Sequence, residues 1–82
     1  MTIKDFYNAH LCQTSGVVYQ GNDAVCNGVI VRYYGEKIAA LEDCTLELYA
    51  IGYSTSTTHR HSILKQIAEE RGWTVHERSM VV

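Results

Sequence analysis

The sequence predicts an α+β fold: an antiparallel sheet of roughly four to five strands, with one main helix packed on one face and a short N-terminal helix at an edge. Two observations favour this class. The middle of the chain is a series of short segments rich in β-branched and aromatic residues, separated by residues that favour turns. Residues 59–71 instead repeat apolar side chains at helical spacing. The short connections predict an antiparallel meander, because a parallel crossover needs about a dozen residues.

The N-terminal helix is expected from Ile3 to His10. Thr2 can act as its N-cap, because a threonine hydroxyl accepts a hydrogen bond from a backbone N–H of the first turn. Ile3, Phe6 and Tyr7 fall on one side of this helix and supply its apolar face.

The first strands follow the helix. Residues 17–19 form a short apolar strand that ends at the turn residues 20–23, Gln-Gly-Asn-Asp. Residues 24–34 are interpreted as one longer strand in which Gly28 marks a bulge. Gly35 then supplies the positive φ that a tight hairpin turn between twisted strands needs.

Two further strands complete the predicted meander. Residues 38–41 return along the preceding strand, and residues 42–43, Glu-Asp, make the next turn. Residues 44–51 alternate apolar and polar side chains, which is typical of a half-buried strand, and Gly52 ends this strand.

The main helix is expected from His59 to Arg71, with Thr58 as its N-cap. Gly72 is a suitable C-terminal stop, and a basic residue in the last turn suits the helix dipole. The stripe that faces the core consists of Ile63, Leu64, Ile67 and Ala68.

The last strand is expected within residues 73–82, with an interruption near residues 77–78. Its apolar tip, Met80–Val82, pairs either with the sheet or with another chain. In the second case the protein is a homodimer in which this tip adds a strand across a two-fold axis.

Length and composition exclude several classes of protein. The chain has 82 residues, which predicts a single domain over residues 1–82. Apolar residues make up 46% and the net charge is −2, so the chain should fold and is not basic throughout. It has no apolar stretch of membrane-spanning length and no secretory signal pattern, so we expect a cytoplasmic protein without a membrane partner.

Cys12, Cys26 and Cys44 cannot all pair within one chain, and their wide spacing matches neither a zinc ribbon nor a redox motif. We interpret them as reduced, structural thiols, since free cysteine is often buried. No nucleophile, phosphate-loop or dinucleotide motif is present in the sequence. The sequence therefore predicts a protein that is not an enzyme and uses no cofactor.

The start of the main helix is a candidate anion site. A helix N-terminus attracts anions, and a guanidinium, an imidazole and hydroxyl groups there can bind phosphate or carboxylate. This candidate consists of Ser56, Thr57, Thr58, Arg60 and His61. In the alternative interpretation, Arg60 pairs with an internal carboxylate such as Glu42, Asp43 or Glu47. His59 and His61 are poor metal ligands, because residues two apart on a helix point about 200° apart.

Tyrosines and carboxylates indicate a second candidate site, a partner-binding surface on the sheet. Tyrosine is enriched in protein interfaces, and the chain has 6 tyrosines but 1 tryptophan and 1 phenylalanine. The turns and Glu47 are expected to form an acidic edge, which attracts basic protein surfaces. The surface consists of Tyr33, Tyr34, Glu36, Glu42, Asp43, Glu47 and Tyr49. In the alternative, these are ordinary half-buried tyrosines and solvated charges.

Two segments resemble a family of small proteins encoded by phages and plasmids. Residues 34–39, Tyr-Gly-Glu-Lys-Ile-Ala, are similar to a Ser-Tyr-x-Thr-x-Ile-Ala strand of that family. Here Tyr33 replaces the serine and Glu36 the threonine. Residues 56–63, Ser-Thr-Thr-His-Arg-His-Ser-Ile, are similar to its Thr-Thr-x-Arg-His helix start. The resemblance implies a mobile genetic element and no catalytic residue.

Small acidic proteins of mobile elements often occupy host or defence proteins, among them CRISPR effector complexes. We therefore expect a non-enzymatic, anti-CRISPR-like binding protein that antagonises a host or defence complex through protein–protein contacts in the bacterial cytoplasm. The second hypothesis is a nucleic-acid or nucleotide phosphate binder that uses the helix start from Thr58 to His61.

Overall fold

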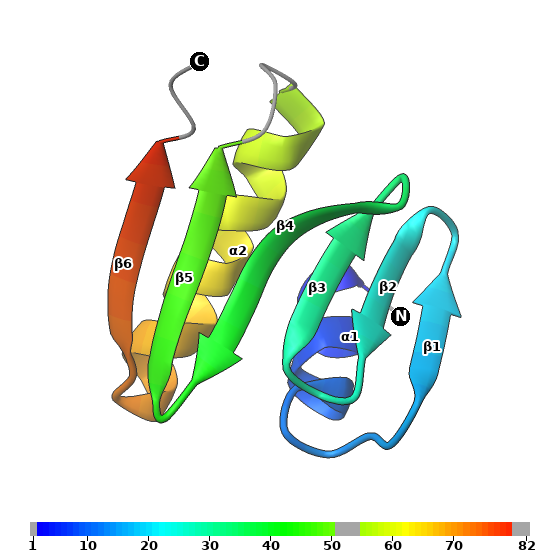
Figure 1. The fold of residues 1–82 in the computed structure, drawn as a ribbon, viewed down its shortest axis with the longest axis horizontal. Coiled ribbons are helices and arrows are strands. Elements are labelled where there is room, and N and C mark those ends of the chain that lie inside the picture. The colour runs from blue at the N-terminus through cyan, green and yellow to red at the C-terminus, as the bar shows by residue number, and fades with distance from the viewer. Residues whose placement is uncertain (1, 51–54, 80–82) are drawn as a thin grey trace.

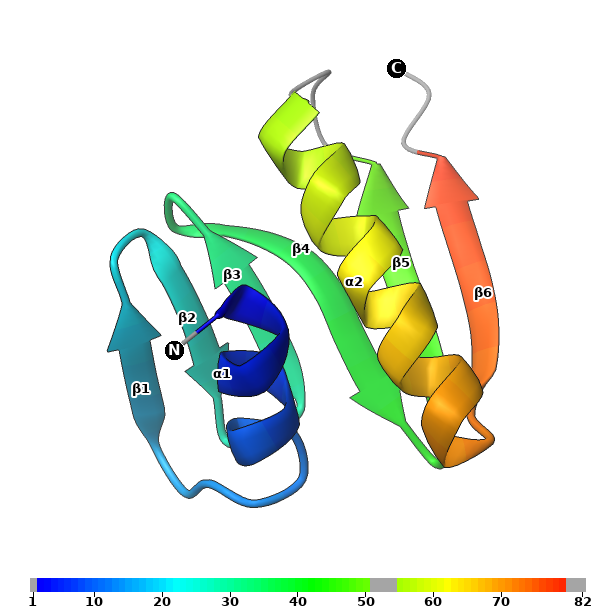
Figure 2. The same cartoon turned by 180° about the vertical axis from the view of Figure 1, so that it is seen from behind.

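The computed structural model describes residues 2–50 and 55–79, and these form a two-layer α+β fold of the predicted class. Both helices lie on the same face of one sheet, and none of the described residues forms a helix on the sheet's other face (Figures 1 and 2). The elements are α1 (Ile3–His10), β1 (Val17–Gln20), β2 (Asp23–Cys26), β3 (Ile30–Tyr33), β4 (Glu36–Glu42), β5 (Thr45–Ala50), α2 (Thr55–Arg71) and β6 (Thr74–Ser79). The sheet has six strands in the order β1-β2-β3-β4-β5-β6, where the sequence had predicted four to five.

Helix α1 has the predicted boundaries, because its start is encoded locally. The hydroxyl of Thr2 accepts a hydrogen bond from the backbone N–H of Asp5, and the Asp5 carboxylate accepts one from the backbone N–H of Thr2. This reciprocal capping satisfies two backbone donors that a helix start otherwise leaves free. Phe6 and Tyr7 are buried against the sheet.

The predicted strand over residues 24–34 is in fact two strands, β2 and β3, joined by a tight turn. Asn27 and Gly28 both have positive φ, 50° and 67°, so the chain reverses here and Gly28 is not a bulge. Asparagine followed by glycine is the dipeptide that best tolerates this pair of conformations. The predicted turn at Gly35 is confirmed, with φ of 78°.

The turn between β4 and β5 lies one residue later than predicted. Asp43 and Cys44 have φ of 48° and 62°, and Glu42 is the last residue of β4, paired with Thr45.

Strand β4 carries the bulge of this sheet. Val31 pairs with Ala39 and Arg32 with Lys37, so Ile38 is an extra residue on β4. Ile38 and Ala39 are consecutive and both buried, which a regular strand would not allow. The strand bends strongly at the middle of the sheet (Figure 1).

The last strand pairs in parallel, which corrects the prediction of a wholly antiparallel sheet. Strands β5 and β6 run in the same direction, and helix α2 is the crossover between them. With 17 residues, α2 is long enough for such a crossover. Seen from the helix side, β6 lies to the right of β5 with both strands pointing upward, so the connection has the usual right hand (Figure 2). Strand β6 also continues through Glu77 and Arg78, where an interruption was predicted.

Helix α2 begins at Thr55, four residues before the predicted start, and ends at Arg71 as predicted. Gly72 follows with φ of 74°, which confirms it as the C-terminal stop. Serine and threonine are weak helix formers, but Thr57 is buried, so packing extends the helix beyond its sequence preference. Gly52 and the tip Met80–Val82, which also carried predictions, lie outside the described residues.

The core fills the space between the two helices and the sheet. Helix α1 lies over the half of the sheet formed by β1–β3, and α2 over the half formed by β4–β6 (Figure 2). The largest fully buried side chains of the core are Tyr7, Leu11, Val25, Val31, Ile38, Leu46, Leu48, Leu64 and Ile67.

Gly28 yields a stability prediction, because a side chain there meets the backbone after α1. A Cβ at this position would lie 3.0 Å from the Cys12 nitrogen, whereas one at Gly21, which also has positive φ, would have nothing within 4 Å. Gly21→Ala should cost about 1 kcal/mol for its left-handed conformation alone. Gly28→Ala should cost a further 1–3 kcal/mol, roughly, for overpacking. Urea unfolding of the two variants measures the difference, and equal losses would contradict it.

Candidate functional site

Ser56, Thr57 and Thr58 of the predicted anion site lie in the first turn of α2, whereas Arg60 and His61 lie beyond it. Because α2 begins at Thr55, Arg60 lies in its second turn, where the influence of the helix dipole has largely faded. Ser56 is half-buried, Thr57 is buried and Thr58 is exposed. The placement of Arg60 in the first turn, from which the anion hypothesis began, was therefore wrong.

Arg60 instead forms an internal ion pair with Asp23 of β2. Its Nε and Nη2 atoms donate to Oδ1 and Oδ2 of Asp23 over 2.8 and 3.0 Å, a bidentate arrangement. Its Nη1 atom donates to the backbone oxygen of Ser56 over 3.2 Å, and the guanidinium lies 4.1 Å from the centre of the Tyr33 ring. The internal-carboxylate interpretation thus describes this arginine, although the carboxylate is Asp23 and not Glu42, Asp43 or Glu47.

Tyr7 of α1 completes this cluster. Its hydroxyl donates to Oδ1 of Asp23 over 3.0 Å, and both side chains are buried. Burial, and then the adjacent Asp23 carboxylate, raise the pKa of Tyr7 well above its ordinary value, so the hydroxyl stays protonated and remains a donor. One carboxylate therefore joins α1, β2 and α2.

His61 also faces the sheet. Its Nε2 atom lies 3.0 Å from the backbone oxygen of Ile38. Since a carbonyl oxygen only accepts, Nε2 must carry the proton of this hydrogen bond. Ile38 is the bulged residue, whose carbonyl a regular ladder would have paired, so His61 compensates for the bulge. Arg60 and His61 thus both hold α2 against the sheet.

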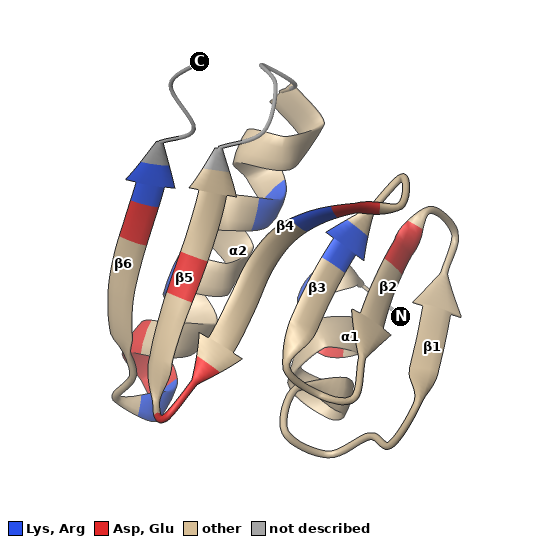
Figure 3. Cartoon of the chain, viewed as in Figure 1, with Lys and Arg blue, Asp and Glu red and all other residues tan. Residues whose placement is uncertain are grey.

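The predicted acidic edge does not form, because consecutive hairpin turns lie at opposite ends of the strand between them. Glu36 begins β4 and Glu42 ends it, and this strand has 7 residues. Its ends are therefore about 20 Å apart at roughly 3.3 Å per residue. Acidic and basic segments are accordingly interspersed across the sheet (Figure 3).

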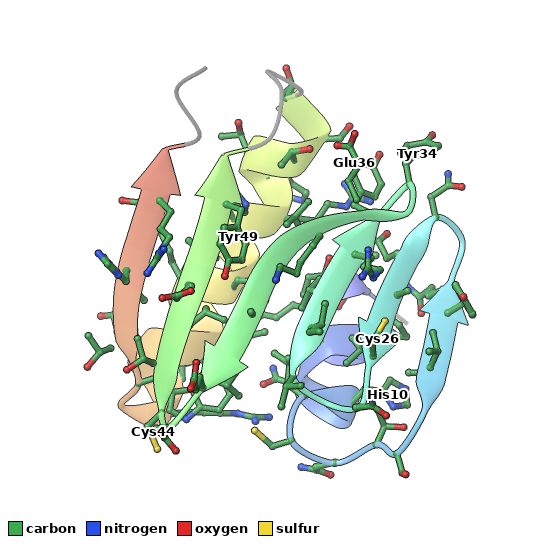
Figure 4. All side chains as sticks on the ribbon, in the orientation of Figure 1. His10, Cys26, Tyr34, Glu36, Cys44 and Tyr49 are labelled. Carbon is green, nitrogen blue, oxygen red and sulfur yellow. The ribbon has the colours of Figure 1, made fainter. Side chains whose placement is uncertain are left out.

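The residues of the predicted partner surface are also divided between the two faces. Tyr33 faces the helices, beneath Arg60, and is partly buried. Tyr34 is 68% exposed at the turn before β4, close to Glu36 (Figure 4). Asp43 lies in the turn at the opposite end of the sheet. Of the seven predicted residues, Glu47 and Tyr49 lie near the middle of the open sheet face.

That open face carries a row of aromatic and basic residues, of which the sequence had pointed only to Tyr49. Strand register places Tyr19, Ala24, Arg32 and Lys37 next to one another across β1–β4, and Tyr49 next to Arg78 across β5 and β6. The Lys37 ammonium lies 5.0 Å from the centre of the Tyr49 ring and so connects the two halves. We call Tyr19, Arg32, Lys37, Tyr49 and Arg78 the Tyr–Arg row.

The outward orientation of Arg32 could have been found from strand alternation. Arg32 lies between Val31 and Tyr33, which face the helices, so it must face outward. The register that aligns it with Lys37 and Tyr19, however, depends on turns that the sequence analysis misplaced.

Glu47 fixes the β5 and β6 end of the row. The Tyr49 hydroxyl donates to Oε2 of Glu47 over 2.7 Å, and Nη2 of Arg78 lies 3.2 Å from Oε1. Chiefly through the Tyr49 hydrogen bond, and further through the Arg78 charge, the pKa of Glu47 is held below its ordinary value of 4.5. The same bond raises the pKa of Tyr49. Glu47 therefore holds the side chains of Tyr49 and Arg78 in place on the open face.

The three cysteines are free thiols. Free thiols agree with the prediction that the cysteines are reduced, but Cys12 and Cys44 are exposed, so burial does not support a structural role for these two. Cys26 is partly buried on β2, on the open face, and Cys44 lies at the end of the sheet opposite Tyr34 (Figure 4). Within residues 2–50 and 55–79, no three His, Cys, Asp or Glu side chains gather as a metal site would require.

The chain matches no protein-family model, no curated protein and no solved structure in comparisons with known proteins. Among the helices that the structure describes, none combines the length and the apolar character needed to cross a membrane.

The Asp23–Arg60 pair should contribute far more to stability than an exposed pair of the same fold. The side chains of Arg60 and Asp23 are 15% and 3% exposed, and those of Lys4 and Glu70, which pair over 2.6 Å, are 37% and 55% exposed. Asp23→Asn leaves a largely buried guanidinium without its counter-charge and should cost about 3–5 kcal/mol. Lys4→Met should cost less than about 1 kcal/mol. Similar losses in urea unfolding would contradict this ranking.

The carboxylate of Glu47 should titrate below pH 4.5 in the folded protein, and Tyr49→Phe should move this pKa upward, because the hydroxyl that favours the ionised form is lost. The depressed pKa means that its stabilising effect is present above pH 4.5 and is lost as the pH falls through the folded-state value.

Carboxyl carbon shifts in NMR titrations measure this change. Glu77 is the control: its pKa is lowered by Lys65 on the other face, so Tyr49→Phe should leave it unchanged. An unmoved Glu47 titration would contradict the assigned cause.

Proposed function

We propose that the protein is a non-enzymatic binding protein and that it contacts its partner through the open face of its sheet. The observation that carries this proposal is the position of the helices. Because α1 and α2 both cover the same face, no element within residues 2–50 and 55–79 covers the other face of the six strands, and the Tyr–Arg row lies across its middle.

The chemistry of that face supports binding. Tyrosine and arginine are the side chains that, with tryptophan, most often dominate binding energy at interfaces. Tyr49 and Arg78 are held by Glu47 before any partner arrives, so less side-chain entropy is lost on binding. Tyr19, at the β1 end, is 73% exposed and has a large ring surface to offer.

The partner we propose is a host or defence complex of a bacterial cell, such as a CRISPR effector, with the protein acting in the cytoplasm as an antagonist encoded by a phage or plasmid. The resemblance of residues 34–39 and 56–63 to proteins of mobile elements supports this setting. Phosphate binding at Thr58–His61 has less support, because Arg60 and His61 already have internal partners.

Two charge reversals test the proposal on opposite faces. Arg78 and Lys65 are 56% and 46% exposed, and each pairs with one glutamate, Glu47 and Glu77 respectively. Arg78→Glu replaces the cation that pairs with Glu47 by a second negative charge on the open face. It should therefore disrupt the Tyr–Arg row and abolish antagonism. Lys65→Glu makes the same change of charge on the helix side and should preserve it.

The measurement is plasmid transformation into cells with active CRISPR defence, together with mass spectrometry of complexes that co-purify with each variant. We expect wild type and Lys65→Glu to restore transformation and retain the same defence complex, and Arg78→Glu to lose both. Equal behaviour of the two folded variants would overturn the proposed binding face.

A further inference from the structure

We propose that the Tyr–Arg row binds single-stranded nucleic acid, with the strand lying across the six β-strands. The inference rests on the proposed function in one respect, since it uses the same open face, and it specifies what that face recognises. A defence complex that holds a guide or displaced strand would offer such a ligand.

The charge of the row differs in sign from that of the chain. The whole protein has a net charge of −2, yet Arg32, Lys37 and Arg78 place three cations on the row. Glu47 is the carboxylate that pairs with Arg78, so two positive charges remain in excess at this level of the sheet. A cationic track on an otherwise acidic protein is complementary to a phosphate backbone.

Aromatic rings interrupt the cations, and this favours nucleic acid over an acidic protein surface. Tyr19 and Tyr49 lie at separate positions along the row, with Arg32 and Lys37 between them. Unpaired bases stack on such rings while arginine and lysine contact the adjoining phosphates. An acidic protein surface would use the cations but would have no need for exposed ring faces between them.

The contact between Lys37 and Tyr49 is the part of the row that can rearrange when a nucleic-acid strand binds. The Lys37 ammonium lies over the Tyr49 ring, 5.0 Å from its centre, at the end of a flexible four-carbon side chain. A base can occupy that place on the ring while the ammonium moves to the neighbouring phosphate. The hydrogen bond from Tyr49 to Glu47 meanwhile holds the ring in position.

The position of Glu42 favours a path across the strands. Glu42 ends β4 on the open face, because its neighbour Leu41 faces the core, so a phosphate backbone running along this strand would meet negative charge at that end. The row itself crosses six strands spaced about 4.8 Å apart, which gives a track of roughly 24 Å. A track of this length accommodates a segment of a few nucleotides, at the lower end of the site sizes of single-strand binders.

Fluorescence anisotropy with a labelled oligothymidine tests the inference, with a duplex of equal length and a polyglutamate peptide as competitors. Three phosphate contacts predict that affinity falls about 20-fold as salt rises from about 50 to about 200 mM. Tyr49→Ala should weaken binding about 5- to 150-fold through lost stacking, and Tyr49→Phe, which keeps the ring but loses its hydrogen bond to Glu47, should retain most of the affinity. Arg78→Glu should lower both affinity and salt dependence, and Lys65→Glu should change neither.

Absence of binding at low salt would overturn the inference, as would equal affinity for duplex. Effective competition by polyglutamate together with an unaffected Tyr49→Ala variant would identify an acidic protein as the ligand and also overturn it. The proposed function fails separately. If Arg78→Glu loses antagonism but wild type binds no oligonucleotide, the function stands without this ligand. If wild type binds oligonucleotide while Arg78→Glu retains antagonism, the ligand stands without that function.

Discussion

The buried carboxylate of Asp23 is the constraint on which the arrangement of both helices depends. It accepts hydrogen bonds from Tyr7 of α1 and from Arg60 of α2, and it is carried by β2 between them. A buried charge is tolerated only with well-placed partners, so both helices must lie on the same face of the sheet as Asp23. Among the described residues, no buried side-chain nitrogen or oxygen lacks a partner. This polar cluster therefore specifies one geometry for two helices that are distant in the sequence.

A second set of contacts holds the other ends of the helices together. Arg71, in the last turn of α2, donates to the backbone oxygen and the side-chain oxygen of Asn8 and to the backbone oxygen of Leu11, and its guanidinium lies 5.0 Å from the centre of the Trp73 ring. It thus satisfies carbonyls that the end of α1 leaves free. With both helices fixed on one side at two points, the opposite face of the sheet is available for binding without loss of the core.

The features predicted correctly from the sequence are those that adjacent residues decide. The Thr2 cap, the stop at Gly72 and the hairpin at Gly35 each depend on a few neighbouring positions, and all three are found. The Asp23–Arg60 pair joins residues 37 positions apart, and Asp23 appeared from sequence to be an ordinary turn residue. The overlooked turn at Asn27 and Gly28 also hid one strand. Without that strand the register was wrong, and so the Tyr–Arg row could not be assembled, because it depends on which residues of neighbouring strands align.

The difference between Arg60 and Arg78 explains why the sheet face, and not the start of α2, is the candidate binding site. Both are arginines paired with one carboxylate, but Arg60 is 15% exposed beside a carboxylate that is 3% exposed, whereas Arg78 is 56% exposed beside one that is 23% exposed. An external anion at Arg60 would have to displace Asp23, which would leave a buried negative charge without a partner cation. At Arg78 the released Glu47 would still face water and keep its bond from Tyr49. The same guanidinium chemistry therefore maintains the fold in one place and can serve recognition in the other.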